Sequence, residues 1–362
     1  MNALRRILLT GIVALAGGAL FTLLQLPIPW LLGPMAAVLV GSRLLKWPLT
    51  WPNRIRDAGI VIVGYTTGLS LTPSALAEIV RQLPSMLTMT LALLALCATI
   101  AFALSKLTGV DFPTMMTGSI PGGLSQMVTL AEEFPGVDLT VVTFLQVTRL
   151  MMIIFCVPLL LYSPLLGADH AVAGAGAAPA AGGEAWAALF PNIWIFAPLC
   201  VLCAWAGQRL KLPTAFMLGP MIGTAAVHLA GLNGPALPSA LLDLSQFMIG
   251  AHVGLMLHPE KLERKVRTIA MSVASGAILI AGSFGFSSLL TRIHAVSPAT
   301  ALLSLAPGGM DQMGIMAHEV GADLSVVSGY QTFRILFIYV VVASVLKVIW
   351  RFHFRQMSQS GR

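Results

Sequence analysis

The chain has 362 residues, of which 57% are hydrophobic and only 10% are charged, and its formal net charge is +7. A soluble domain carries about 25% charged residues, so the composition excludes a soluble enzyme, a DNA-binding domain and a disordered regulator. The solvent and partner of such a chain is the lipid bilayer. Its excess of Lys and Arg indicates basic cytoplasmic loops, and we expect no nucleic acid as a partner.

The apolar stretches form two series of five along the chain. Several are shorter than the ~20 residues of a full membrane span, so we expect some helices to be short, kinked or buried within the protein. We interpret the first stretch, which follows Arg5 and Arg6, as a transmembrane helix and not as a cleaved leader, because it has a counterpart in the second series. The stretches cover residues 6–26, 28–45, 55–71, 84–105 and 139–161, then 192–209, 213–230, 243–258, 268–290 and 324–348.

The two series are an internal duplication. An offset of 186 residues aligns Leu-Gly-Pro-Met at 32–35 with 218–221, and Pro-Gly-Gly-x-x-Gln-Met at 121–127 with 307–313. Identities that recur in order over more than 120 residues do not follow from shared apolar composition. We therefore predict four parts: a first membrane repeat over 1–166, an Ala/Gly/Pro-rich linker over 167–190, a second membrane repeat over 191–350, and a basic cytoplasmic tail over 351–362.

The Pro-Gly-Gly segments near 112–133 and 299–319 determine the topology. If they are re-entrant, each half crosses the membrane five times and the second half is inverted; if they cross, the halves are parallel. The inverted arrangement, with both termini cytoplasmic, places 17 of the 21 Lys and Arg residues inside. We therefore predict an all-α polytopic membrane protein of two inverted repeats, each with about five transmembrane helices and a re-entrant or broken segment. This arrangement is typical of secondary transporters.

Each Pro-Gly-Gly motif predicts the start of a half-helix. Proline suits the first helical turn, and the glycines permit a sharp bend and close backbone approach. A half-helix that begins inside the membrane presents free N–H groups and the positive end of its dipole, which together form an anion site. The alternative is a kink that serves packing alone. The candidate solute-binding residues of these segments are Pro121, Gly122, Gly123, Gln126, Pro307, Gly308, Gly309 and Gln312.

One arginine lies deep in the last span of each half. Asp138 and Asp323 are predicted N-caps, and eleven residues further on Arg149 and Arg334 lie roughly 16 Å into the helix. A charge at that depth costs several kcal/mol unless it is paired or hydrated. Two interpretations stay open: the arginines contact an anionic solute, or they hold carbonyls at the helix break or pair with a glutamate. Candidate residues on the same helical faces are Gln146 and Gln331.

The halves differ at one chemically important position. Ser125 of the first half corresponds to Asp311 of the second, so Asp311 is an extra carboxylate and a candidate for coupling to a proton or sodium ion. The Cys200-x-x-Cys203 spacing has neither a second pair nor a nearby histidine, and the chain has no P-loop. We therefore expect no metal and no other cofactor.

Each half contains a Leu-Gly-Pro-Met motif and a Pro-Gly-Gly motif, followed by Gln-x-x-Arg. Through these motifs the chain resembles the bacterial AbrB membrane-protein duplication family over nearly its whole length. The resemblance implies a bacterial inner-membrane location. Some catalogues label that family an ammonia monooxygenase and others a regulator of gene expression; the first label does not suit a sequence without a metal-ligand cluster.

The sequence favours a secondary transporter of a small anionic solute that works by alternating access. The alternative is a membrane sensor or regulator of gene expression that acts through a partner, although no loop or tail is long enough to fold as an output module. An enzyme with an intramembrane site comes third, and we expect no enzymatic activity. Whether the protein forms a homo-oligomer stays open.

Overall fold

The computed structural model describes residues 3–134, 136–163, 186, 189–190, 192–256 and 265–350. Over these residues the chain forms fourteen α-helices and no strand, which confirms the all-α class. Most of the predicted linker and the whole predicted tail lie outside the described residues, as does most of the basic segment 261–267.

Of the described helices, seven belong to the first half of the chain and seven to the second. The first seven are α1 (Ala3–Leu23), α2 (Pro29–Arg43), α3 (Asn53–Ser70), α4 (Pro73–Thr108), α5 (Phe112–Ser119), α6 (Leu124–Glu132) and α7 (Leu139–Leu161). The second seven are α10 (Ile193–Arg209), α11 (Ala215–Leu229), α12 (Ser239–Met256), α13 (Lys265–Ile293), α14 (Pro298–Leu305), α15 (Met310–Glu319) and α16 (Leu324–Phe337), which continues into the π-helical turn η3 (Ile338–Val342).

The helix boundaries repeat with the offset that the sequence motifs have. Both ends of α11, α12 and α14 lie 186 residues after the ends of α2, α3 and α5. The backbone before α2 and α11 also repeats, since Ile28 and Thr214 both have a left-handed φ of 47°. The same local structure therefore occurs twice.

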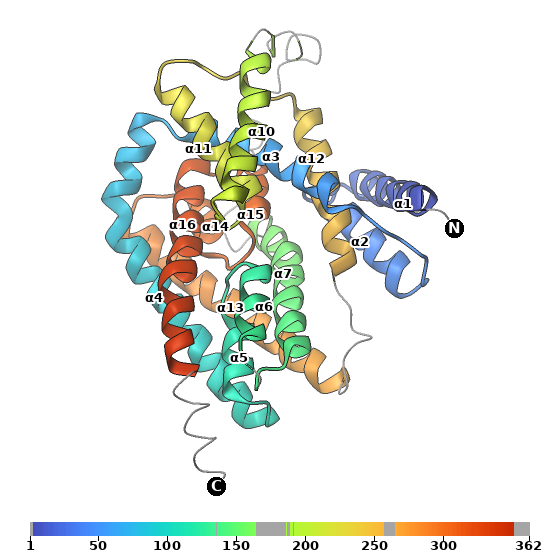
Figure 1. The fold of residues 1–362 in the computed structure, drawn as a ribbon, viewed down its shortest axis with the longest axis vertical. Helices are drawn as coiled ribbons and strands as arrows, with labels where there is room; N and C mark the ends of the chain where they lie inside the picture. The colour runs from blue at the N-terminus through green and yellow to red at the C-terminus, as the bar shows by residue number, and fades with distance from the viewer. Residues whose placement is uncertain are drawn as a thin grey trace.

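The packing between the halves also repeats. Helix α2 packs against α12 as α3 packs against α11, and α4 packs against α16 as α7 packs against α13. Helices α3 and α12 also contact each other, as do α4 and α13. In Figure 1, α4 extends along one side of the molecule, while α1 and α2 project to the right. Matching helices of the two halves thus make matching contacts with the other half.

Among the described residues, five helices are long and apolar enough to cross a membrane: α1, α4, α7, α13 and the continuous segment Leu324–Trp350. Helices α10 and α11 are apolar but shorter. Large apolar side chains on these elements point outward; Leu23 of α1 is 81% exposed and Trp194 of α10 is 73% exposed. Such a surface suits lipid as solvent. Five of the ten predicted spans thus correspond to helices of full length, and the other five crossings stay a prediction.

Glycines let the first two helices of each half approach backbone to backbone. A Cβ atom on Gly33 of α2 would lie 2.4 Å from the carbonyl oxygen of Gly17 in α1, and one on Gly219 would lie 2.3 Å from the carbonyl oxygen of Cys203. Small residues at helix contacts are how membrane helices gain close packing. Leu-Gly-Pro-Met is therefore a packing motif in both halves.

Candidate functional site

The site is built from two broken helices. Helix α5 ends at Ser119 and α6 begins at Leu124; in the second half α14 ends at Leu305 and α15 begins at Met310. The Pro-Gly-Gly motifs form the extended connections, and Gly123 and Gly309 are the N-cap residues of α6 and α15. The predicted half-helices through Gln126 and Gln312 are present, but Pro121 and Pro307 lie before the N-cap glycines and not in the first helical turn.

The two predicted N-caps position the helices that carry the arginines. The Asp138 side chain accepts hydrogen bonds from Thr140 N and Val141 N at the start of α7, and Asp323 does the same at the start of α16. Each aspartate also donates its backbone N–H to a threonine two helices earlier, Thr114 Oγ1 at 2.9 Å and Thr300 Oγ1 at 3.0 Å. These bonds hold α7 against α5 and α16 against α14.

In the first half, the glutamine and the arginine of α7 bind the carbonyls at the end of α5. Gln146 Nε2 donates to Thr117 O at 3.0 Å and to Ile120 O at 2.9 Å, and Arg149 Nη1 donates to Ile120 O at 3.0 Å. The last carbonyls of a helix have no partners within it, and its end carries partial negative charge. The pair therefore satisfies and neutralises the end of α5.

The second half repeats this arrangement with more contacts to the arginine. Gln331 Nε2 donates to Leu303 O at 2.7 Å and to Ala306 O at 3.1 Å. Arg334 donates to Leu305 O at 3.3 Å and to Ala306 O at 3.1 Å, and its guanidinium also contacts Gln331 Oε1. Both arginines thus hold carbonyls at a helix break, as one of the two interpretations proposes.

The glutamates have other partners. Glu133 Oε1 pairs with Lys347 Nζ at 2.6 Å, and Glu319 Oε1 accepts a hydrogen bond from Gln246 Nε2 at 2.7 Å. The arginine–glutamate pairing that the sequence left open is therefore not the arrangement found.

A cavity of about 280 Å³ lies between the two breaks. Nine of the thirteen predicted site residues line it, and three further polar residues join them. Pro121, Pro307, Gln331 and Arg334 do not line the cavity, so the two arginines, equivalent in sequence, differ in position. The lining includes Gly122, Gly123, Gln126, Gln146, Arg149, Gly308, Gly309, Asp311 and Gln312, together with Arg56, Thr214 and His252.

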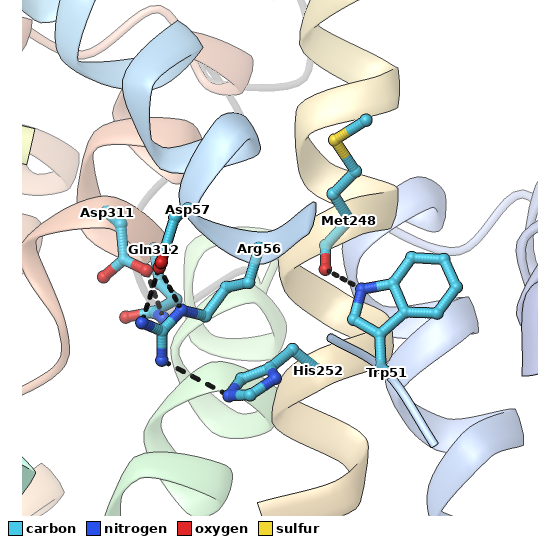
Figure 2. A network of polar contacts seen from close by, with 7 residues as sticks. All are labelled: Trp51, Arg56, Asp57, Met248, His252, Asp311 and Gln312. Atoms are coloured by element: carbon cyan, nitrogen blue, oxygen red, sulfur yellow. Dashed lines mark hydrogen bonds and ion pairs between the residues drawn. The ribbon is translucent and has the colours of Figure 1, made fainter. Parts of the chain in front are cut away.

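Sequence reasoning missed the polar network of α3 and α12 (Figure 2). Arg56 Nη2 pairs with Asp57 Oδ1 at 2.6 Å, and Arg56 Nη1 lies 3.3 Å from His252 Nε2. Asp311 and Gln312 of α15 lie beside this pair, with Gln312 Nε2 donating to Asp311 Oδ2 at 2.8 Å. One feature of the sequence could have indicated this network, namely the match of Asp57 with Asp243 in the duplication. His252 could not have been found in this way, because its counterpart is Thr66.

Several buried polar atoms of the lining residues have no partner among the described residues. They include two nitrogen atoms and three amide oxygens: Arg149 Nε, His252 Nδ1, Gln126 Oε1, Gln146 Oε1 and Gln312 Oε1. Buried polar atoms are normally hydrogen-bonded, and leaving one unpaired is costly. The cavity is therefore suited to a polar solute or to water.

Access to the cavity differs between the halves. A second hollow of about 550 Å³ adjoins it at Gln126 and Thr214, and its lining includes the exposed Thr129 and the half-buried Lys347. Beside α15, a space near Gln246 and Glu319 measures about 10 Å³, which holds at most one water. The cavity thus continues outward along α6, whereas the space found beside α15 is narrow.

These features define a class: an α-helical protein with membrane-length apolar helices and a duplicated pair of broken helices around a polar cavity. The chain belongs to the AbrB family, because the family model described as "Transition state regulatory protein AbrB" matches residues 30–350.

Two relatives match almost the whole chain. "Putative regulator AbrB" of Escherichia coli (strain K12) is 28% identical over 333 residues, covering 91% of this chain and 92% of the relative. "Uncharacterized protein YhjN" of Bacillus subtilis (strain 168) is 25% identical over 358 residues, covering 94% of this chain and 92% of the relative. The sequence resemblance to the family is thereby confirmed.

Proposed function

We propose that the protein is a secondary transporter of a small anionic solute, which binds in the cavity between the two helix breaks. The observation that carries the proposal is the joint lining of this cavity by the glycines of both Pro-Gly-Gly motifs, the start of α6 and Arg149. A helix N-terminus and a buried guanidinium both favour an anion.

The anion binds at the start of α6. The first turn of α6 contains no acidic residue, whereas the first turn of α15 contains Asp311. No carboxylate in the first turn of α6 therefore competes with a solute for the N–H groups at the start of this helix. Arg149 is 6% exposed, lines the cavity and has an unpartnered Nε, so a carboxylate at α6 gains a second donor there. Gln126 and Gln146 supply further polar contacts.

Alternating access follows from the duplication in this proposal. The halves are inverted repeats in the bacterial inner membrane, both termini are cytoplasmic, and the cavity lies at their interface. Three observations support this: the distribution of Lys and Arg, the packing that repeats on exchange of the halves, and the hollow along α6. In Figure 1, the start of α10, which follows the linker, and the end of the helix that continues α16 lie toward opposite ends of the long axis.

The test is transport by purified protein in proteoliposomes. We expect uptake of one or more small organic anions from a panel of mono- and dicarboxylates, driven by an ion gradient. Arg149→Gln should lose this uptake, while Arg292→Gln, which changes an arginine near the exposed end of α13, should keep it. If no anion is taken up by vesicles whose protein is folded and correctly inserted, the proposal fails.

The second candidate is a regulator of gene expression, which the printed names of the family and of the Escherichia coli relative favour. A deletion strain complemented with Arg149→Gln separates the two. Transcription changes that the variant restores fully would favour a regulator independent of the cavity. Transcription changes that only the transporting protein restores would make regulation a consequence of solute movement.

A further inference from the structure

Asp311 is a carboxylate that lines the cavity and forms no ion pair within the described part of the chain. It lies in the first turn of α15 and accepts a hydrogen bond from Gln312 Nε2 at 2.8 Å. Among the described residues no Lys, Arg or His forms an ion pair with it, because the nearby Arg56 is held by Asp57 at 2.6 Å. The first half has Ser125 at this position, so the duplication does not require the charge.

The charged and titratable groups around Asp311 come from four other helices. Helix α3 contributes Arg56 and Asp57, α12 contributes His252, and α7 contributes Arg149, all in or beside the cavity. Helix α16 contributes Arg334, which is bound to the carbonyls at the end of α14. The described lining residues from α6 and α11 are uncharged.

We infer that Asp311 carries a proton that accompanies the anion, so that the protein is a proton–anion symporter; this rests on the proposed function. An ionised Asp311 and a bound anion would place two negative charges in one cavity of about 280 Å³. Like charges at close quarters disfavour each other's ionised form. Protonation of Asp311 removes one of them and strengthens anion binding.

The proton step is a simple acid–base transfer. A proton from water on the open side forms an O–H bond with a carboxylate oxygen of Asp311, and the same proton returns to water when the cavity opens to the other side. One monoanion and one proton cross together without net charge. Because linkage is reciprocal, the anion raises the affinity of Asp311 for the proton by the same factor.

The test uses the full chain in detergent with formate, acetate and lactate as probes, between about pH 6 and about pH 8, where carboxylates of this type stay ionised. Affinity is measured by isothermal titration calorimetry. The wild type should bind at least one probe about 10- to 100-fold more tightly at the lower pH, a range typical of coupled sites. In weakly buffered solution, a pH indicator should register uptake of protons on binding.

Two variants remove the carboxylate and one removes the other titratable group. Asp311→Asn and Asp311→Ser, the second of which restores the residue of the first half, should bind with the same affinity at both pH values and take up no proton. His252→Gln should keep the pH dependence, whatever its affinity. Using both Asp311 variants guards against a failure of one of them to fold.

The outcomes separate this inference from the proposed function. Binding by the wild type that is independent of pH, or that depends on sodium instead, overturns the symport inference and leaves anion binding intact. Loss of the pH dependence in His252→Gln, or its retention in both Asp311 variants, also overturns the inference. If no probe binds and none of the organic anions is transported, the proposed function fails and the inference falls with it.

Discussion

The two arginines offer a matched pair of substitutions, because they arose from one residue by duplication and now have different surroundings. Arg149 lines the cavity, and its one carbonyl partner, Ile120 O, also accepts a hydrogen bond from Gln146 at 2.9 Å. Arg334 does not line the cavity, and its partner Leu305 O is not reached by Gln331. Arg149→Gln should therefore affect binding, and Arg334→Gln should affect stability.

The magnitudes follow from these contacts. Arg334→Gln leaves a buried carbonyl without its side-chain donor, which costs about 1–3 kcal/mol, and removes a charge from a helix C-terminus, worth about 1 kcal/mol. We expect a loss of about 3 kcal/mol in the free energy of unfolding. Arg149→Gln leaves Ile120 O bonded and should cost about 1 kcal/mol of stability, but it should weaken anion binding by about 2–5 kcal/mol.

The assay is thermal unfolding in detergent, with and without a saturating anion that the wild type binds. Arg334→Gln should lower the melting temperature of the unliganded protein and keep the ligand-induced rise. Arg149→Gln should keep most of the melting temperature and lose the rise, and Arg149→Lys should restore it poorly, because an ammonium lacks the planar fork. Equal destabilisation by both variants, or a lost ligand response in Arg334→Gln alone, would refute the reasoning.

Three further predictions test the topology, the one-sided access and the helix contacts. Reporters fused within 167–184 and at the C-terminus should report the periplasm and the cytoplasm respectively; the same side for both would exclude inverted repeats. In a cysteine-free background, Thr129→Cys on the open face of α6 should react rapidly with a water-soluble thiol reagent. Ile315→Cys, the matched position on α15 and 5% exposed, should be protected, and equal labelling rates would contradict one-sided access. Gly33→Ala, whose Cβ would lie 2.4 Å from a backbone oxygen, should destabilise the protein by about 2–3 kcal/mol in denaturant unfolding. The control Gly11→Ala, with its nearest neighbour at 3.9 Å, should have little effect.

Much of the local structure could be predicted from the sequence because it depends on residues close together in the chain. Asp138 and Asp323 are recognisable N-caps, and Pro-Gly-Gly is a recognisable helix start. The duplication added a second reading of each signal, and it correctly predicted the buried Gln-x-x-Arg faces in the described halves, with Arg149 and Arg334 6% and 3% exposed.

The partners of those faces could not be predicted, because they depend on packing between distant segments. Helical spacing places Arg149 and Gln146 on one face but does not say that the end of α5 lies opposite. Arg56 and His252 reach the cavity because α3 and α12 pack together across the two halves. Neither residue has a counterpart of its own type in the other half. The comparison of the two halves, which indicated the rest of the site, therefore could not indicate these two residues.

The surroundings of α6 and α15 differ in a few side chains on otherwise matching helices. Glu319, at the end of α15, is held by Gln246 of α12, whereas the residue that corresponds to Gln246 in the first half is Ile60. Glu133, the counterpart of Glu319, is instead paired with Lys347 at the rim of the open hollow.

One backbone arrangement thus occurs twice with different closing contacts. Two conformations can exchange readily only when their free energies differ by a few kcal/mol, and a single hydrogen bond to a charged group is worth about 1.5–3 kcal/mol. Contacts such as Gln246–Glu319 are therefore of the right size to favour one side without preventing the other from opening. In this interpretation the duplication supplies two similar gates, and the substitutions accumulated since then determine which of them is closed at rest.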